Sequence, residues 1–173
     1  PKTNIYLDKF SKILCGKFKP NHFRGVINVI NRFLNIIKPS YIFLGLKDFQ
    51  QLELIKSHID KNKIKTKLFP CSTVREKNGI AYSSRNLRLK KNQFKSAGNI
   101  YNYIKNNKKF ILSKILNKEK MHIYQKMINL GASKIDYIEC INLSNKTICK
   151  NTKLKFNIFI AYYVGKVRLI DNL

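Results

Sequence analysis

The first part of the chain alternates between helical and extended apolar patterns, and this order most constrains what the chain can fold into. Residues 25–38 carry apolar side chains at helical spacing. The run 41–45 is short, apolar and rich in aromatic residues, as expected of a buried parallel strand. Residues 48–61 return to helical spacing, and residues 63–69 alternate as a second strand. Helix, strand, helix, strand predicts a parallel α/β unit.

Both helical stretches carry apolar positions that indicate amphipathic helices. In the first stretch, which Pro39 ends, these positions are Val26, Val29, Ile30, Phe33 and Ile37. In the second stretch, one side of the helix carries Phe49, Leu52, Ile55 and Ile59.

The pattern changes after residue 73. A turn at Asn78-Gly79 precedes a polar, hydroxyl-rich loop that ends near residue 86. Residues 91–130 predict two charged helices, and residues 135–142 predict a strand. Residues 156–170 predict a hairpin with its turn at Gly165-Lys166. The sequence therefore predicts an α/β segment, residues 1–73, followed by a small α+β domain, residues 74–173.

The net charge of +26 arises from 35 Lys and Arg against nine Asp and Glu. A polyanion such as nucleic acid is one explanation. However, most of the excess is Lys, it is spread along the chain, and it accompanies abundant Asn and Ile, a bias typical of A/T-rich codons. We therefore favour mutational drift over a specific nucleic-acid partner, and a basic nucleic-acid-binding module remains the alternative.

Cysteine spacing and hydropathy argue against a metal-binding protein and a membrane protein. The four cysteines form no CxxC pair and only three histidines occur, so we expect no metal site and reduced thiols in a cytoplasmic protein. No apolar run reaches the ~20 residues of a membrane span, so no membrane partner is expected. The chain begins with Pro1 rather than Met, which suggests a piece of a longer chain.

The first candidate site follows the apolar run 41–45. Ligands of open α/β sheets bind beyond the carboxyl ends of the strands, and a helix start suits phosphate. Gly45 would let the backbone approach a ligand, Lys47 could contact a phosphate, and Gln51 could hold a hydroxy acid. Alternatively, Asp48 is a helix cap and Lys47 a solvated surface charge.

The second candidate site is the loop Ser83-Ser84-Arg85-Asn86. Two hydroxyls and a guanidinium make a good anion-binding loop, which could stabilise a pyrophosphate leaving group. The alternative is a polar turn in which a serine caps a backbone group. In a third segment, His22 and Arg24 flank an aromatic residue before a helix, and there we favour a structural hydrogen-bonding histidine.

Four ordered segments resemble the pantothenate synthetase family. They are KPNHFRGV (19–26), GLKDFQQL (45–52), STVREKNGIAYSSRN (72–86) and VRLIDN (167–172). The resemblance implies the C-terminal part of a Rossmann-like nucleotidyltransferase domain, followed by a small lid domain. It also implies the ATP- and Mg²⁺-dependent condensation of pantoate with β-alanine, through pantoyl adenylate, in a homodimer. Pantothenate and coenzyme A biosynthesis is the implied pathway.

The resemblance also assigns roles to residues. Gly45, Leu46, Lys47 and Asp48 would line the ATP site, and Gln51 would bind pantoate. Val74 would contact adenine through its backbone. The triphosphate would be covered by Tyr82, Ser83, Ser84 and Arg85. For catalysis we select the charge-neutralising and positioning groups, which are Lys47, Ser83, Ser84 and Arg85.

The sequence departs from the family pattern in three respects. The family's Met-Gly-x-Leu-His-x-Gly-His signature does not occur in these 173 residues. Lys19 and Asn21 stand where the family often has Arg and Gly, and Leu46 replaces the usual Glu. We therefore expect the chain alone to be inactive, and a degenerate remnant is a further alternative. An open α/β fragment would also expose a sheet edge, so we expect the isolated chain to aggregate.

Overall fold

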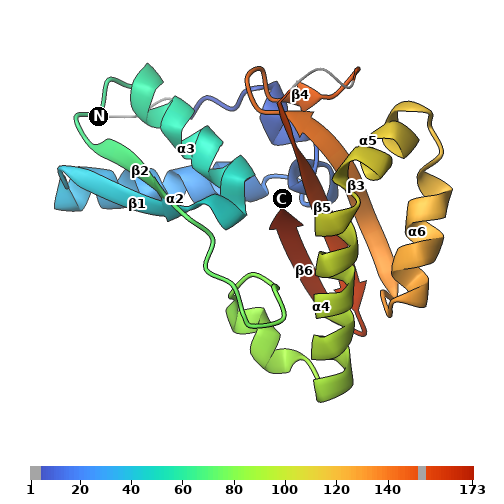
Figure 1. Ribbon diagram of the computed structural model, residues 1–173. Helices are drawn as coiled ribbons and strands as arrows, with labels where there is room; N and C mark the ends of the chain where they lie inside the picture. The colour runs from blue at the N-terminus through green and yellow to red at the C-terminus, as the bar shows by residue number, and fades with distance from the viewer. Residues whose placement is uncertain (1–4, 152–154) are drawn as a thin grey trace. The chain divides into compact units, whose positions relative to one another are not determined.

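The computed structural model describes residues 5–151 and 155–173, which form two compact units, Pro1–Thr73 and Val74–Leu173. We call them unit 1 and unit 2 (Figure 1). The division falls at residue 73, where the sequence pattern changes. Among the helices of the described ranges, none has the length and apolarity to span a bilayer.

Unit 1 contains a two-stranded parallel sheet and two long helices (Figure 1). Two short elements, η1 (Lys9–Lys12) and α1 (Cys15–Phe18), precede α2 (His22–Ile37). The chain continues as β1 (Tyr41–Gly45), η2 (Leu46–Asp48), α3 (Phe49–Lys61) and β2 (Lys67–Cys71). The predicted order of helix, strand, helix and strand is confirmed.

The second strand differs from its predicted range. It begins at Lys67 rather than residue 63, because Lys63 takes a positive φ of 50° that ends the preceding helix turn. It also includes Pro70, which pairs in register with Leu44. Proline donates no backbone hydrogen bond and is tolerated at a sheet edge.

The core of unit 1 confirms one predicted helix face and corrects the other. In α3, Leu52, Ile55 and Ile59 are buried, as the spacing predicts. In α2 the predicted stripe is only partly right, since Val26 and Ile30 pack against the core but Val29, Phe33 and Ile37 are exposed. The buried side of α2 comprises Phe23, Ile27, Asn31 and Leu34. The apolar side chains of α2 form one broad arc opposite Arg24, Asn28 and Arg32, and only part of that arc faces the core, so spacing alone could not select the buried side.

One face of the small sheet is aromatic and exposed. Tyr41, Phe43 and Phe69 are 52%, 65% and 44% exposed, and both other rings contact Phe69, with centroids 5.4 and 5.7 Å away. The alternate residues Ile42 and Leu44 pack toward the core of α2 and α3. Parallel strands are normally covered on both faces, so this apolar face is suited to burial.

Unit 2 is a four-stranded antiparallel sheet with three helices and a long loop (Figure 1). The loop leads through η3 (Ser84–Arg88) to α4 (Lys91–Asn106), α5 (Lys108–Leu116) and α6 (Lys120–Asn129). The strands are β3 (Lys134–Asn142), β4 (Thr147–Ile148), β5 (Phe156–Val164) and β6 (Val167–Asn172), in the order β4-β3-β5-β6.

The core of unit 2 joins the helices to the sheet. Its fully buried members include Ile100 of α4, Ile111 of α5, Met127 of α6, Ile138 of β3 and Ile158 of β5. The predicted strand and hairpin are confirmed, with Gly165 at a positive φ of 57° in the turn. The prediction of two helices is wrong, because three form.

Candidate functional site

The first candidate site begins at the carboxyl end of β1. Because β1 and β2 are parallel, Gly45 lies opposite Cys71 at the same end of the sheet. Leu46, Lys47 and Asp48 form the short helix η2, which runs directly into α3. Apart from Gly45 and its two chain neighbours, no heavy atom of the described residues lies within 4 Å of the position that a Cβ on Gly45 would take. A ligand could therefore approach the backbone closely at this strand end.

Lys47 is held near the protein rather than extended into solvent. Its side chain is only 16% exposed, and its Nζ lies 3.6 Å from a carboxylate oxygen of Asp48. The alternative of a solvated surface lysine is therefore wrong. Asp48 occupies the N-cap position of α3, but its side chain makes no capping hydrogen bond. The Lys47 ammonium group therefore lies beside the start of α3, with part of its charge balanced by the Asp48 carboxylate.

Two adjacent glutamines at the start of α3 have different environments. Gln50 is buried, donates from Nε2 to the carbonyl oxygens of Phe10 and Ile13, and accepts from the backbone N–H of Cys15. These bonds fix the segment before α2 to α3. Gln51, the predicted pantoate ligand, is half-buried. Gln50 is thus a structural residue, and Gln51 is the glutamine that a ligand could reach.

The third segment contributes to a pocket in unit 1. Lys19, Asn21 and Arg24 line it together with residues of the N-terminal segment such as Lys12. Asn21 takes a positive φ of 62° at the start of α2. His22 is exposed, with its ring centroid 5.2 Å from that of Phe23. Two lysines and an arginine make this pocket suited to an anion.

The second candidate site lies on a tight hairpin-like loop in unit 2. Arg75 and Ala81 form an isolated antiparallel bridge. Around it, the N–H of Tyr82 donates to the oxygen of Val74 at 3.0 Å, and the N–H of Glu76 donates to the oxygen of Ile80 at 2.8 Å. Val74 and Tyr82 are both exposed. Val74 and Tyr82, two of the residues predicted to contact ATP, therefore lie side by side.

Ser83 follows directly as the N-cap of η3, and Ser84 and Arg85 are the first two residues of that helix. The Oγ of Ser83 accepts a hydrogen bond from the N–H of Arg85 at 3.2 Å, as the alternative of a polar turn with a capping serine predicts. Ser84 is exposed and Arg85 is half-buried. The charge of Glu76 and the hydrogen bond that its carboxylate accepts from the Tyr82 hydroxyl raise the pKa of Tyr82, which keeps the phenol neutral. The loop thus offers hydroxyl, phenol and guanidinium donors on one short segment.

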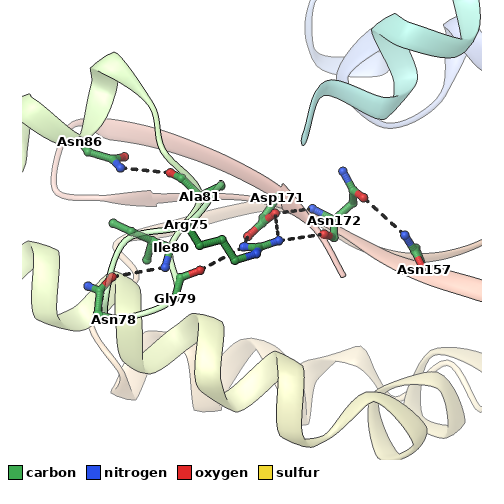
Figure 2. Close-up of polar contacts among 9 residues, drawn as sticks. All are labelled: Arg75, Asn78, Gly79, Ile80, Ala81, Asn86, Asn157, Asp171 and Asn172. Carbon is green, nitrogen blue, oxygen red and sulfur yellow. Dashed lines mark hydrogen bonds and ion pairs between the residues drawn. The ribbon is translucent and has the colours of Figure 1, made fainter. Parts of the chain in front are cut away.

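An ion pair joins this loop to the C-terminal strand (Figure 2). The Arg75 guanidinium donates to both carboxylate oxygens of Asp171, at 2.6 and 3.1 Å. It also donates to the carbonyl oxygens of Gly79 and Asn172. Burial opposes its charge, but the hydrogen bond and the charge of Asp171 outweigh this and raise the pKa of Arg75.

Further amide contacts fix the loop to its surroundings (Figure 2). Asn86 donates to the oxygen of Ala81 at 3.0 Å, and Asn78 accepts from the N–H of Ile80. Asn78 also donates to the oxygen of Phe94 on α4. Every turn of the loop is therefore tied to β6, η3 or α4.

The sequence prediction missed Arg75, Asp171 and Gln50. Arg75 and Asp171 lie within the quoted segments 72–86 and 167–172, so the segments held the signal. The ion pair between them could not be predicted from local patterns, because 96 residues separate them in the sequence. Gln50 could not be told from Gln51 by residue type alone.

Metal ligands are sparse in the described ranges. No group of three or more His, Cys, Asp or Glu side chains there could hold a metal ion. The chemistry available at the two candidate sites is therefore donor and cation chemistry, suited to binding phosphate or carboxylate oxygens.

Comparison with known proteins gives one consistent result. The family model described as "Pantoate-beta-alanine ligase" matches residues 1–173. The chain is 36% identical over 174 residues to the pantothenate synthetase of Caldicellulosiruptor bescii, covering 99% of this chain and 62% of that protein. It is 39% identical to the pantothenate synthetase of Endomicrobium trichonymphae, covering 99% and 61% of the two chains. The chain thus spans about three fifths of the length of these relatives.

Solved structures agree in fold. A pantoate-beta-alanine ligase from Francisella tularensis, complexed with beta-gamma ATP and beta-alanine, is 35% identical, with a TM-score of 0.74 over 97% of this chain and 56% of that one. Pantothenate synthetase from Thermus thermophilus, at 22% identity and a TM-score of 0.84, supports the same mixed α/β fold. The family model extends over all 173 residues, and the chain therefore belongs to the pantoate–β-alanine ligase family.

Proposed function

We propose that the protein condenses pantoate with β-alanine in an ATP-dependent reaction, the step that makes pantothenate for coenzyme A biosynthesis. The observation that carries the proposal is the family match across residues 1–173. A 35% identical relative was solved as a complex with an ATP compound and β-alanine, which supports the same substrates here.

The first proposed step is formation of pantoyl adenylate. A carboxylate oxygen of pantoate attacks the α-phosphorus of ATP, and the bond to the β-phosphate breaks, releasing pyrophosphate. The carboxylate is already ionised, so this step requires positioning and charge neutralisation rather than a general base. Lys47, Ser83, Ser84 and Arg85 are the residues proposed to supply that neutralisation.

The proposal assigns separate substrate contacts to residues of each unit. Unit 1, as the C-terminal part of a Rossmann-like domain, would line ATP with Gly45, Leu46, Lys47 and Asp48, and would hold pantoate with Gln51. Unit 2, as the lid domain, would contact adenine through the backbone of Val74. Its hairpin-like loop would cover the triphosphate with Tyr82, Ser83, Ser84 and Arg85.

The second proposed step consumes the adenylate. The amine of β-alanine attacks the acyl carbon, the acyl–oxygen bond breaks, and AMP leaves while the amine loses a proton. Excluding water at this stage protects the reactive anhydride from hydrolysis. The exposed Val74 and Tyr82 are proposed to pack on the nucleotide and help to exclude water.

Mg²⁺ would accompany ATP rather than occupy a protein cage. The proposed ATP-binding residues include a single carboxylate, Asp48, and the described residues hold no carboxylate cluster. Mg²⁺ commonly binds through substrate phosphates and water with few protein ligands. When bound, it would neutralise phosphate charge, and the basic and hydroxyl groups of this chain would act alongside it.

The proposed assembly is a cytoplasmic homodimer of a longer polypeptide. The relatives are longer than this chain, and the family's histidine-containing signature is absent from these 173 residues. We therefore propose that the 173-residue chain alone does not complete the reaction.

Pantoate-dependent exchange of pyrophosphate into ATP tests this proposal. The assay is run on the 173-residue chain and on the chain joined to any adjoining coding sequence of its source. We expect exchange only in the longer protein. Lys47→Ala and Arg85→Ala should each lower the exchange rate about 10²-fold or more.

A matched control is Arg88→Ala, which removes an exposed cation from the same short helix as Arg85. We expect its exchange rate to stay within about two-fold of the parent, in line with the small effects of exposed groups. Absence of exchange in both folded proteins would refute the active ligase and leave a degenerate remnant.

The charge of +26 favours one second candidate, a polyanion-binding module. Specific binding of nucleic acid should fall steeply with salt and prefer particular sequences or shapes. Drift-derived charge should give weak binding with no such preference. Titrating the chain with DNA and RNA oligonucleotides at several salt concentrations separates the two.

A further inference from the structure

Arg75 is the residue that connects the hairpin-like loop to β6, while Asn78 bonds it to α4. Its guanidinium donates to the Asp171 carboxylate on β6 and to the oxygen of Gly79 within its own loop. It also lies over the ring of Tyr101 on α4, 4.8 Å from the ring centroid. One side chain thus contacts its own loop, β6 and α4, and Figure 2 shows its hydrogen bonds to the loop and to β6.

The guanidinium of Arg75 is already occupied. Both terminal nitrogens donate to protein oxygens, four acceptor atoms in all, and Asp171 balances the charge. The side chains of Arg75 and Asp171 are 23% and 9% exposed. Recruiting Arg75 to a phosphate would require breaking this bidentate pair and leaving the Asp171 carboxylate buried and unpaired, which is costly.

The position of the donor residues depends on Arg75 through a short path of backbone contacts. The Arg75–Ala81 bridge places Ala81, and the next hydrogen bond places Tyr82 against Val74. Asn86 then bonds the oxygen of Ala81, which fixes η3 to the same bridge. Ser83, Ser84 and Arg85 lie between these two fixed points, so their geometry follows from the bridge.

We propose that Arg75 and Asp171 form a positioning pair that sets the geometry of Ser83, Ser84 and Arg85 toward the triphosphate, and that Arg75 does not itself bind the nucleotide. This inference rests on the proposed ligase function. It assigns the two arginines of segment 72–86 to different tasks: Arg75 fixes the loop, and Arg85 meets the phosphates.

A direct phosphate ligand and a positioning residue respond differently to substitution. If Arg75 only fixes the loop, Asp171→Asn should lower the rate of pyrophosphate exchange as much as Arg75→Gln does. The double variant should then be no slower than either single variant. If Arg75 bound phosphate directly, Asp171→Asn would free its charge and leave ATP use unharmed, and Arg75→Lys would restore much of it.

The test measures pyrophosphate exchange in the active, longer protein and amide hydrogen exchange across residues 74–86. We expect Arg75→Gln, Arg75→Lys and Asp171→Asn each to lower kcat/KM for ATP about 10- to 100-fold, since a shift near 1 Å costs about 10² in rate. The KM for pantoate should change less than about two-fold. The amides of Glu76 and Tyr82 should exchange at least about ten-fold faster.

The Arg168–Asp136 ion pair provides a matched control within unit 2. Arg168 also lies on β6 and donates from Nε to Asp136 at 2.7 Å, with side chains 11% and 3% exposed. Arg168→Gln should lower Tm but leave kcat/KM for ATP and the amide hydrogen-exchange rates of residues 74–86 unchanged. A merely structural role for Arg75 would make its variants behave like Arg168→Gln.

Two results would overturn the proposal. The first is unchanged kcat/KM for ATP in Arg75→Gln and Asp171→Asn while the parent is active. The second is unchanged amide exchange at Glu76 and Tyr82 in the same variants, which can be read even if the parent lacks activity. An inactive parent whose loop amides lose protection in these variants would instead count against the ligase function, and would support the fixing of the loop by the pair.

Discussion

Nε2 of His58 lies 3.2 Å from Oδ1 of Asn31, and this hydrogen bond joins α3 to α2 inside the core of unit 1. His58 is fully buried. The side-chain amide nitrogen of Asn62 lies 3.2 Å from Nδ1 and can only donate to it. The imidazole is therefore neutral, with its proton on Nε2, and a second proton would point at the Asn62 amide.

This arrangement predicts that unit 1 loses stability in mild acid. Burial lowers the pKa of His58, whereas in the unfolded chain it titrates near 6.5. The unfolded chain therefore binds more protons below about pH 6.5, and stability falls as pH decreases from there through the folded pKa, at up to about 1.4 kcal/mol per pH unit. Hydrogen exchange of α2 and α3 in urea at pH 7.5 and 5.5 measures the effect.

The matched pair of variants is His58→Gln and His122→Gln, because His122 is exposed. His58→Gln should reduce the pH dependence of the stability of unit 1, and His122→Gln should leave that dependence unchanged. An unchanged pH dependence in His58→Gln would contradict the assignment.

Gly79→Ala should destabilise unit 2. Gly79 has a φ of +92°, and an added Cβ would lie 2.0 Å from the Tyr101 ring. Strained backbone and overlap together should cost roughly 2–4 kcal/mol. Gly25→Ala is the control, since beyond the chain neighbours and the nearby backbone of α2 no described heavy atom lies within 4 Å of its added Cβ. Alanine there should stabilise by about 0.5–1 kcal/mol. Thermal unfolding of both variants checks the signs, and equal effects would be inconsistent with the geometry.

Thiol reactivity should separate the cysteines. Cys71 is exposed, whereas Cys140 and Cys149 are buried. Burial, with a smaller contribution from neighbouring Cys149, raises the pKa of Cys140 to about 12, so the reactive thiolate is scarce at pH 8. We expect a fast phase with a disulfide reagent at pH 8 that Cys71→Ser removes. Reaction of Cys140 and Cys149 should await unfolding, and rapid modification of either in the native protein would disprove their burial.

The aromatic face of β1 and β2 should drive association of the isolated chain. Tyr41, Phe43 and Phe69 form an exposed apolar surface, and such surfaces mark interaction sites or aggregation. Phe43→Ser with Phe69→Ser should lower the apparent mass in light scattering at high concentration while retaining the circular dichroism spectrum. Leu87→Ser, which removes an 89% exposed side chain from η3, should not. A monodisperse parent chain would contradict this prediction.

Most elements could be predicted from local patterns. The spacing in residues 48–61 predicts the buried side of α3, because polar residues occupy its other side. The buried side of α2 was predicted only in part, because the exposed residues Val29, Phe33 and Ile37 are as apolar as the residues that face the core. The helix break at Asn107 was missed, since residues 91–130 carry no proline and their charge pattern continues across the break.

The sequence by itself determined the order of the elements, the position of the change at residue 73 and the four segments that mark the family. These are local properties, carried by apolar period, turn residues and short motifs. Only the tertiary structure decided which of two similar residues does which task. It buries Gln50 and leaves Gln51 half-buried, and it pairs Arg75 with Asp171 across 96 residues, whereas no carboxylate of residues 5–151 and 155–173 forms an ion pair with Arg85. Burial and pairing are set by contacts between distant segments, and no local pattern records them.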